Sequence, residues 1–275
     1  MYHYHWGLSE SPFRNCLDPR RFHKSVAHDE ALARLHFLTD QRRRLGVLLA
    51  GPGCGKSLLL EVFAGESRRV RREVAIVGLA GLTPDELLWQ LSARLGLNPG
   101  GSARGPQMWQ KLVDRFAENR RQGIDTVLLL DDADEAAAEA RALVARLAVC
   151  DSSPDARLTI VLTADSDRLA RLGPRLLELA ELRIDVAPWE FSDTVEFVLA
   201  ALHGAGRDAP AFSDQALHKL HELAGGTPRR IVQLADLALL AGAGQDLSLV
   251  DAATVATVRE ELALPVPAEA AAAEH

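Results

Sequence analysis

Hydrophobic and polar positions divide the chain into two regions with different periodicity. In the first region, short continuous apolar runs alternate with longer stretches in which apolar residues recur at helical spacing. Continuous runs of this kind are typical of parallel strands that are covered on both faces. The runs are Leu45–Ala50, Glu73–Gly78, Thr126–Leu130 and Arg157–Thr163, and Leu182–Val186 alternates like an edge strand. The pattern predicts an α/β fold built on a parallel sheet.

From Pro188 onward the pattern predicts helices only. Amphipathic stretches separated by glycine-bearing turns cover residues 190–205, 214–223, 228–241 and 251–262. We interpret them as a small helical lid. The predicted organisation is an N-terminal segment with a leading helix over residues 1–40, a core domain over 41–188, the lid over 189–262 and a disordered tail over 263–275. The tail is rich in alanine and glutamate, a composition that does not build a core.

Composition narrows the class of protein. With 48% hydrophobic and 25% charged residues over 275 positions, the chain can bury a sizeable core. The net charge of −7 restricts any nucleic-acid contact to local patches. Three scattered cysteines do not make a disulfide framework or a zinc site, which fits a cytoplasmic location. No apolar run approaches the roughly 20 residues of a membrane span, so we expect neither a membrane-spanning nor a secreted protein.

The first apolar run ends in a glycine-rich loop that is followed by a helical stretch. Positions 50–57 fit the phosphate-loop pattern GxxxxGK[ST], with Ala50 in place of the first glycine. Such a loop turns backbone N–H groups around an anion, and the following helix adds the positive end of its dipole. Lys56 would reach the β- and γ-phosphates of ATP, and the Ser57 hydroxyl would complete the coordination of Mg²⁺. The predicted nucleotide-binding residues are Gly51, Pro52, Gly53, Cys54, Gly55, Lys56, Ser57 and Leu58.

A second chemical signal follows the apolar run that ends at Leu130. Acidic residues stand directly after it, where ligands bind in open α/β sheets. They are Asp131, Asp132, Asp134 and Glu135. In that position Asp131 would hold the magnesium shell, and Asp132 would orient and deprotonate the attacking water. The next apolar run ends in Thr163, whose hydroxyl would contact the γ-phosphate. The alternative is an acidic helix cap without a catalytic role.

Two further regions carry candidate contacts to the nucleotide. The turn Gly225–Pro228 begins the third predicted lid helix and places Arg229 on its first turn. A basic residue there opposes the helix dipole, and a residue that breaks a local rule is often functional, so Arg229 is a candidate for reaching the nucleotide. Residues 1–27 are rich in aromatic side chains. They would either cover a core edge or flank the adenine, since an apolar surface must line the base.

With these residues placed, the sequence resembles AAA+ ATPases of the ExeA/GspA type, which act in secretion and pilus biogenesis, and their relatives among TniB-like transposition regulators. The resemblance spans residues 2–262. Its markers are Trp6-Gly7-Leu8, Pro12-Phe13, Asp18-Pro19, His28 with Ala31-Leu32, the phosphate loop, Asp131-Asp132-Ala133 and the turn from Gly225 to Arg229.

This resemblance implies a five-stranded parallel sheet of order 5-1-4-3-2, sandwiched by helices, with the C-terminal helical lid. It places Thr163 at the sensor 1 position and makes Arg229 the sensor 2 arginine, so that both join Lys56 and Asp132 as catalytic residues. It also implies ATP and Mg²⁺ as cofactors and an oligomer of identical chains.

Among its candidate site residues, the sequence departs from the family pattern at two points. Asp132 stands where the family carries a catalytic glutamate, and its side chain is shorter by one methylene, so we expect slow hydrolysis. Arg175 and Arg183 lie in the interval of the arginine finger without matching its motif.

The leading hypothesis is an ATP-hydrolysing oligomeric switch that acts on a protein or DNA partner. The rival hypothesis is a scaffold that binds ATP without hydrolysing it. Asp132 is the residue that distinguishes the two hypotheses, because it stands at the position of the catalytic base. A small-molecule kinase is a third option, but no second substrate pocket can be read from the sequence. A GTPase is disfavoured because the chain lacks the guanine-reading motif Asn-Lys-x-Asp.

Overall fold

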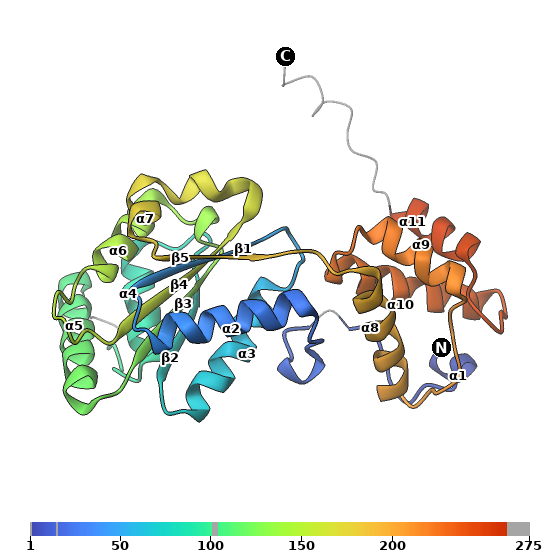
Figure 1. Ribbon diagram of the computed structural model, residues 1–275, viewed down its shortest axis with the longest axis horizontal. Helices are drawn as coiled ribbons and strands as arrows, with labels where there is room; N and C mark the ends of the chain where they lie inside the picture. The colour runs from blue at the N-terminus through green and yellow to red at the C-terminus, as the bar shows by residue number, and fades with distance from the viewer. Residues whose placement is uncertain (1, 15, 101–103, 263–275) are drawn as a thin grey trace, which may run out of the picture. The chain divides into compact units, whose positions relative to one another are not determined.

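The computed structural model describes residues 2–14, 16–100 and 104–262. Contacts divide the chain into two compact units, which we call the sheet unit and the helical unit (Figure 1). The sheet unit is Leu17–Ala187, and the helical unit combines Met1–Cys16 with Pro188–His275. The predicted disordered tail, 263–275, lies outside the described residues. None of the helices in the described ranges has the length and apolar character that a membrane crossing requires.

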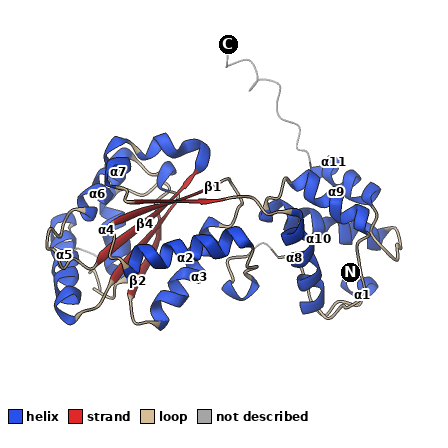
Figure 2. Cartoon of the chain, in the orientation of Figure 1, coloured by secondary structure: helices blue, strands red, loops and turns tan. Residues whose placement is uncertain are grey.

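The sheet unit alternates strands with helices along the chain (Figure 2). Its strands are β1 (Leu45–Ala50), β2 (Glu73–Gly78), β3 (Thr126–Asp131), β4 (Leu158–Asp165) and β5 (Leu182–Val186). Its α-helices are α2 (Val26–Asp40), α3 (Lys56–Arg69), α4 (Pro84–Arg94), α5 (Gly105–Gln122), α6 (Ala138–Ala148) and α7 (Pro174–Leu179). Short 3-10 helices are η1 (Pro19–Arg21), η2 (Ala133–Glu135) and η3 (Ser166–Leu172). Every predicted strand is therefore confirmed.

The five strands form one sheet in the order β2-β3-β4-β1-β5, and all neighbours run parallel. Read from the other edge, this is the expected order 5-1-4-3-2, and β5 is the edge strand that its alternating pattern predicted. Strand β4 lies between β1 and β3, with Thr163 beside Leu48 and Leu162 beside Leu130. Because the strands are parallel, the loops that leave β1, β3 and β4 emerge at the same edge of the sheet.

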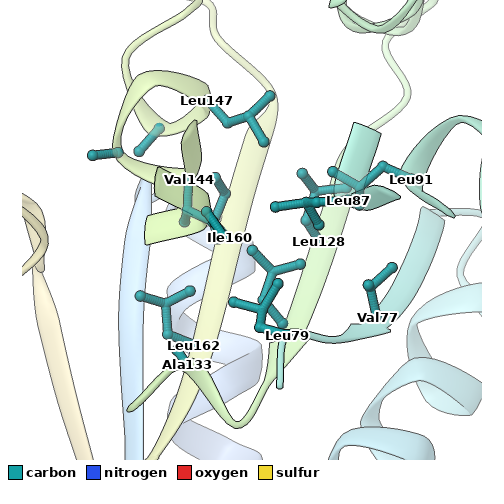
Figure 3. Close-up of a cluster of buried hydrophobic side chains, with 14 of the residues drawn as sticks. Val77, Leu79, Leu87, Leu91, Leu128, Ala133, Val144, Leu147, Ile160 and Leu162 are labelled. Atoms are coloured by element: carbon teal, nitrogen blue, oxygen red, sulfur yellow. The ribbon is translucent and has the colours of Figure 1, made fainter. Parts of the chain in front are cut away.

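Helices cover both faces of the sheet, and consecutive strand residues point to opposite faces. On β3, Leu128 packs into the core formed with α4, α5 and α6, whereas Leu129 packs into the core formed with α2 and α3. Figure 3 shows the first core, where Leu87 and Leu91 of α4 approach Leu128. The two layers bury β1 completely and β3 and β4 up to their last residue, which explains why these central runs are not limited to apolar residues at every second position.

The helical unit contains every helix that was predicted after Pro188. Its helices are α1 (Tyr2–Trp6), α8 (Phe191–Gly204), α9 (Asp214–Ala224), α10 (Pro228–Gly244) and α11 (Ala252–Leu262). Two aromatic residues of the N-terminal segment, Trp6 and Phe13, are buried in its core. The ring of Phe13 meets that of Phe212 with centroids 6.3 Å apart. Trp6 and Phe13 therefore fill a core, the first of the two roles considered for this segment.

Candidate nucleotide-binding site

The phosphate loop connects β1 to α3 through turns that glycine adopts most easily. Gly53 and Gly55 have φ angles of 81° and 88°, in the left-handed region. The N–H of Cys54 donates to the carbonyl oxygen of Gly51 at 3.2 Å and closes the turn. Gly55 is the N-cap of α3, which begins at Lys56. The first turn of a helix has N–H groups without partners inside the helix, so the loop presents a binding site for an anion.

The ammonium group of Lys56 lies against this loop. Its Nζ donates to the carbonyl oxygen of Ala50 at 2.9 Å and to that of Gly51 at 3.3 Å. These bonds use two of the three donors that an ammonium group carries. The positive charge is therefore held at the loop, where the pattern requires it for contact with phosphate.

Ser57, Asp131 and Thr163 form one hydrogen-bonded group at the C-terminal edge of the sheet. Ser57 Oγ donates to Asp131 Oδ2 at 2.5 Å, and Thr163 Oγ1 donates to Asp131 Oδ1. The same Thr163 oxygen accepts the backbone N–H of Asp132 at 2.9 Å. The three side chains come from α3, β3 and β4, so only the parallel sheet brings them together. The two residues predicted to hold the metal ion are thus in direct contact.

Asp132 follows β3 in the left-handed conformation, with φ 53° and ψ 47°. Aspartate is one of the few residues other than glycine that tolerate this conformation. Burial raises the pKa of its carboxyl group, and the charges of Asp131 and Glu135 raise it further, whereas Lys56 opposes the shift. A carboxylate with a raised pKa accepts protons more readily, which suits the role of general base that the sequence suggested.

The other two acids of the cluster, Asp134 and Glu135, lie beside an arginine. Glu135 pairs with Arg168 of η3 at 3.0 Å, and Asp134, which is buried, lies 3.9 Å from the same guanidinium group. The sequence did not single out Arg168, because its separation from the acidic cluster leaves no local signal. The geometry favours Asp131 and Asp132 as the acids of the site.

Arg229 occupies the second position of α10 in the helical unit and is exposed. The turn before it is tightly built. Gly226 has φ 65°, and a Cβ atom on it would lie 2.3 Å from the carbonyl oxygen of Trp189. The N–H of Trp189 donates to the carbonyl oxygen of Gly226 at 2.8 Å. The start of α10, and with it Arg229, is therefore fixed within its own unit.

The two candidates for an arginine finger are exposed and form ion pairs with their sequence neighbours. Arg183 of β5 pairs with Asp185 at 2.7 Å, and Arg175 of α7 pairs with Glu178 at 3.5 Å. Neither pairing involves the phosphate loop or the acidic cluster.

Sequence reasoning gave no role to one buried residue that adjoins the loop. The Nε2 atom of His28, in α2, lies 3.1 Å from the carbonyl oxygen of Cys54. In the sequence, His28 served only as a marker of the family resemblance. Nothing local to it shows that α2 passes the phosphate loop.

The donor set fits Mg²⁺ bound together with a nucleotide. Ser57 Oγ and Asp131 Oδ2 would serve as oxygen ligands, and Mg²⁺ commonly takes one or two protein oxygens and completes its shell with phosphate and water. Within the described ranges, His, Cys, Asp and Glu side chains form no group of three that could hold a metal ion. A metal ion that arrives with phosphate ligands needs no such group.

Sequence comparison agrees with this geometry. Residues 39–172 match the family described as AAA domain, and this stretch contains the phosphate loop, both acids and Thr163. This part of the chain is an AAA domain. Over 245 residues the chain is 27% identical to general secretion pathway protein A of Aeromonas hydrophila. The match covers 88% of this chain and 45% of that protein, so the chain spans about half the length of this relative.

Solved structures share the fold of the AAA domain and its flanking helices. The ORC1 protein of Aeropyrum pernix has a TM-score of 0.67 at 17% identity, with 88% of this chain and 66% of that chain covered. Cdc6p of Pyrobaculum aerophilum has a TM-score of 0.65 at 17% identity, with 93% and 72% covered. RuvB of Thermotoga maritima has a TM-score of 0.56 at 16% identity, with 85% and 69% covered. At these identities the likeness concerns the fold alone.

Proposed function

We propose that this protein is an ATP-hydrolysing switch that assembles into an oligomer of identical chains and acts on a protein or DNA partner. The observation that carries the proposal is the hydrogen-bonded group of Ser57, Asp131 and Thr163 beside a phosphate loop that holds Lys56. The match to the AAA domain family supports nucleotide binding as the general activity.

Each residue of the group would have a distinct part in binding. Lys56 would exchange its bonds to the loop carbonyl groups for bonds to the β- and γ-phosphates. Ser57 and Asp131 would hold Mg²⁺, which neutralises negative charge on the phosphates when it is bound. Thr163 orients the Asp131 carboxylate and would also meet the γ-phosphate.

Asp132 would take a proton from the attacking water. The water oxygen bonds to the γ-phosphorus, the bond from that phosphorus to the bridging oxygen breaks, and ADP leaves with phosphate. The raised pKa of Asp132 supports this role. Because aspartate is one methylene shorter than glutamate, we expect the water to lie farther from its base and hydrolysis to be slow.

Arg229 is our candidate for a residue that distinguishes ATP from ADP. It stands at the positive end of a helix, where a cation is unfavourable unless an anion compensates it. A γ-phosphate would supply that anion.

The names of the relatives support both classes of partner. The ORC1 structure is of a complex with DNA, and RuvB is described as a Holliday junction branch migration motor. General secretion pathway protein A belongs by its name to a secretion pathway. The test is ATP turnover measured with and without DNA, together with light scattering in ATP and in ADP. Turnover above that of Lys56→Ala, and a larger particle in ATP than in ADP, are the expected results.

The second candidate function is a scaffold that binds ATP without hydrolysing it, and the shortness of Asp132 favours it. In that case light scattering still responds to ATP, while turnover equals that of Lys56→Ala under all conditions. A wild-type protein that neither binds ATP nor changes its assembly would contradict both functions.

A further inference from the structure

A buried histidine contacts the phosphate loop from the neighbouring helix α2. His28 is 3% exposed, and its Nε2 atom lies 3.1 Å from the carbonyl oxygen of Cys54. Its Nδ1 atom lies 2.7 Å from the hydroxyl oxygen of Ser25, the N-cap of α2. The ring of Phe22 meets the imidazole edge to face, with centroids 5.4 Å apart. The imidazole is therefore held on three sides inside the sheet unit.

These contacts define which nitrogen carries the proton. A carbonyl oxygen only accepts hydrogen bonds, so Nε2 of His28 donates to Cys54. The Ser25 hydroxyl oxygen accepts the backbone N–H of His28 at 3.3 Å and can donate its own hydrogen to Nδ1. A neutral imidazole with its hydrogen on Nε2 thus fits these three hydrogen bonds.

The bond to Cys54 controls the direction of the next N–H group. The peptide bond between Cys54 and Gly55 is trans, so its carbonyl oxygen and the N–H of Gly55 point in opposite directions. With the oxygen held by His28, the N–H points away from the imidazole. A peptide group beside glycine rotates easily, and a carbonyl oxygen turned into the loop would repel a phosphate.

The fit between the two residues is close. A Cβ atom on Gly55 would lie 3.1 Å from His28 Nε2, and Gly55 has φ 88°. The imidazole therefore occupies the space beside this glycine, and contact as well as hydrogen bonding restrains the loop there.

We propose that His28 is a positioning residue of the phosphate loop. It fixes the peptide group between Cys54 and Gly55 and so orders the loop for phosphate before the nucleotide arrives. The proposal deepens the nucleotide-binding function proposed above and rests on it. His28 acts through the loop backbone, so its effect should be the same for ATP and ADP.

Variants of His28 separate the hydrogen bond from simple packing. His28→Leu removes the donor but keeps an apolar side chain, whereas His28→Gln retains an N–H donor at a position similar to Nε2. The matched control is His36→Leu, because His36 also lies on α2 but bonds to Glu66 of α3 at 2.8 Å. Titration of the full chain with fluorescent ATP and ADP gives the affinities, and thermal melting reports on the fold.

We expect His28→Leu to bind both nucleotides about 3- to 10-fold more weakly, the range that corresponds to the loss of one hydrogen bond. His28→Gln should recover to within about twofold of wild type, and His36→Leu should match wild type. Equal affinities for His28→Leu and wild type would overturn the proposal. An equal loss in His28→Leu and His28→Gln would also overturn it, because the donor would then not matter.

A measurement without nucleotide separates this proposal from the proposed function. Hydrogen exchange of the Cys54 amide, whose N–H donates to the Gly51 carbonyl oxygen at 3.2 Å, should be faster in nucleotide-free His28→Leu than in wild type and His28→Gln. Unchanged exchange would overturn the positioning role even if ATP binds. A wild-type protein that binds no nucleotide, but whose Cys54 amide responds to His28→Leu, would instead refute the nucleotide-binding function and retain the structural effect on the loop.

Discussion

The indole N–H of Trp6 donates a hydrogen bond to the carbonyl oxygen of Leu239 at 2.8 Å, across 233 positions of sequence. The ring is 1% exposed, and a Cβ atom on Gly242 would lie 2.9 Å from it. Arg207 donates to the carbonyl oxygen of Trp6 at 2.7 Å. The first helix of the chain is thus built into the core of the helical unit.

We therefore expect Trp6→Ala to lower the free energy of unfolding by about 3–5 kcal/mol, since the change leaves a cavity and removes the indole hydrogen bond to Leu239. Chemical denaturation followed by circular dichroism measures this. The control is Tyr4→Ala, because Tyr4 is 96% exposed and should change stability by less than about 0.5 kcal/mol. Similar effects of the two substitutions would contradict the packing described here.

Lys56→Ala should abolish nucleotide binding, because the phosphate loop would lose the ammonium group that lies against it. Titration with fluorescent ATP is the measurement. Lys111→Ala is the control, since Lys111 is an exposed lysine of α5 away from the loop. Unchanged affinity in a folded Lys56→Ala protein would refute the assignment of the site.

Asp132→Asn should lower ATP turnover by at least about 10²-fold while ATP binding persists, since a positioned general base contributes about 10² to 10⁴ in rate. Asparagine also tolerates the left-handed backbone at this position, so the loop should keep its shape. Asp132→Glu, which restores the missing methylene, should hydrolyse ATP at an equal or higher rate. The control is Glu135→Gln, because Glu135 pairs with Arg168. A loss of turnover in Glu135→Gln alone would move the base to that residue.

Arg229→Ala should leave the affinity for ADP nearly unchanged and reduce the response of residues 190–262 to ATP in hydrogen exchange. The reason is that a residue which senses the γ-phosphate contributes only when that phosphate is present. Arg230→Ala is a closely matched control, since both arginines are exposed on the first turn of α10. Identical ATP responses in wild type and Arg229→Ala would make this arginine structural.

The cysteines should differ in reactivity toward iodoacetamide. Burial, together with the charge of Asp151, raises the pKa of the Cys150 thiol to about 11. At pH 8 this thiol is protonated and unreactive, and its reactivity should grow as the pH rises toward 11. Cys16 is exposed and Cys54 is buried, so mass spectrometry at pH 8 should find Cys16 modified first. Modification of Cys150 as fast as Cys16 would contradict the raised pKa.

The fold could be predicted from the sequence because its signals are local. The central strands are short apolar runs and β5 alternates like an edge strand. The loop from Gly51 to Ser57 follows the end of β1, and Asp131 and Asp132 stand at the end of β3. A parallel sheet then places them at one edge, as the hydrogen bond from Ser57 to Asp131 confirms.

Contacts between distant segments could not be predicted in the same way. The bonds of His28 to the Cys54 carbonyl group and of Trp6 to the Leu239 carbonyl group involve backbone acceptors, which leave no trace in residue identity. Glu135 pairs with Arg168, but the sequence offers many basic residues that could pair with an acid and does not identify this one. These contacts depend on how the helices pack, which local periodicity does not specify.

The helical unit is built from two separate stretches of sequence. This affects the order in which the two units can fold during synthesis. A nascent chain that has emerged as far as Ala187 contains the complete sheet unit, which can fold at once because domains generally fold as units. Trp6 and Phe13 have already been synthesised at that point, but α10, which forms part of the core around them, has not. At about 5–20 residues per second, translation takes roughly 3 to 10 seconds to reach Leu239. During that interval two large apolar side chains remain without their core, and a chaperone that binds aromatic segments would find its target at the start of the chain.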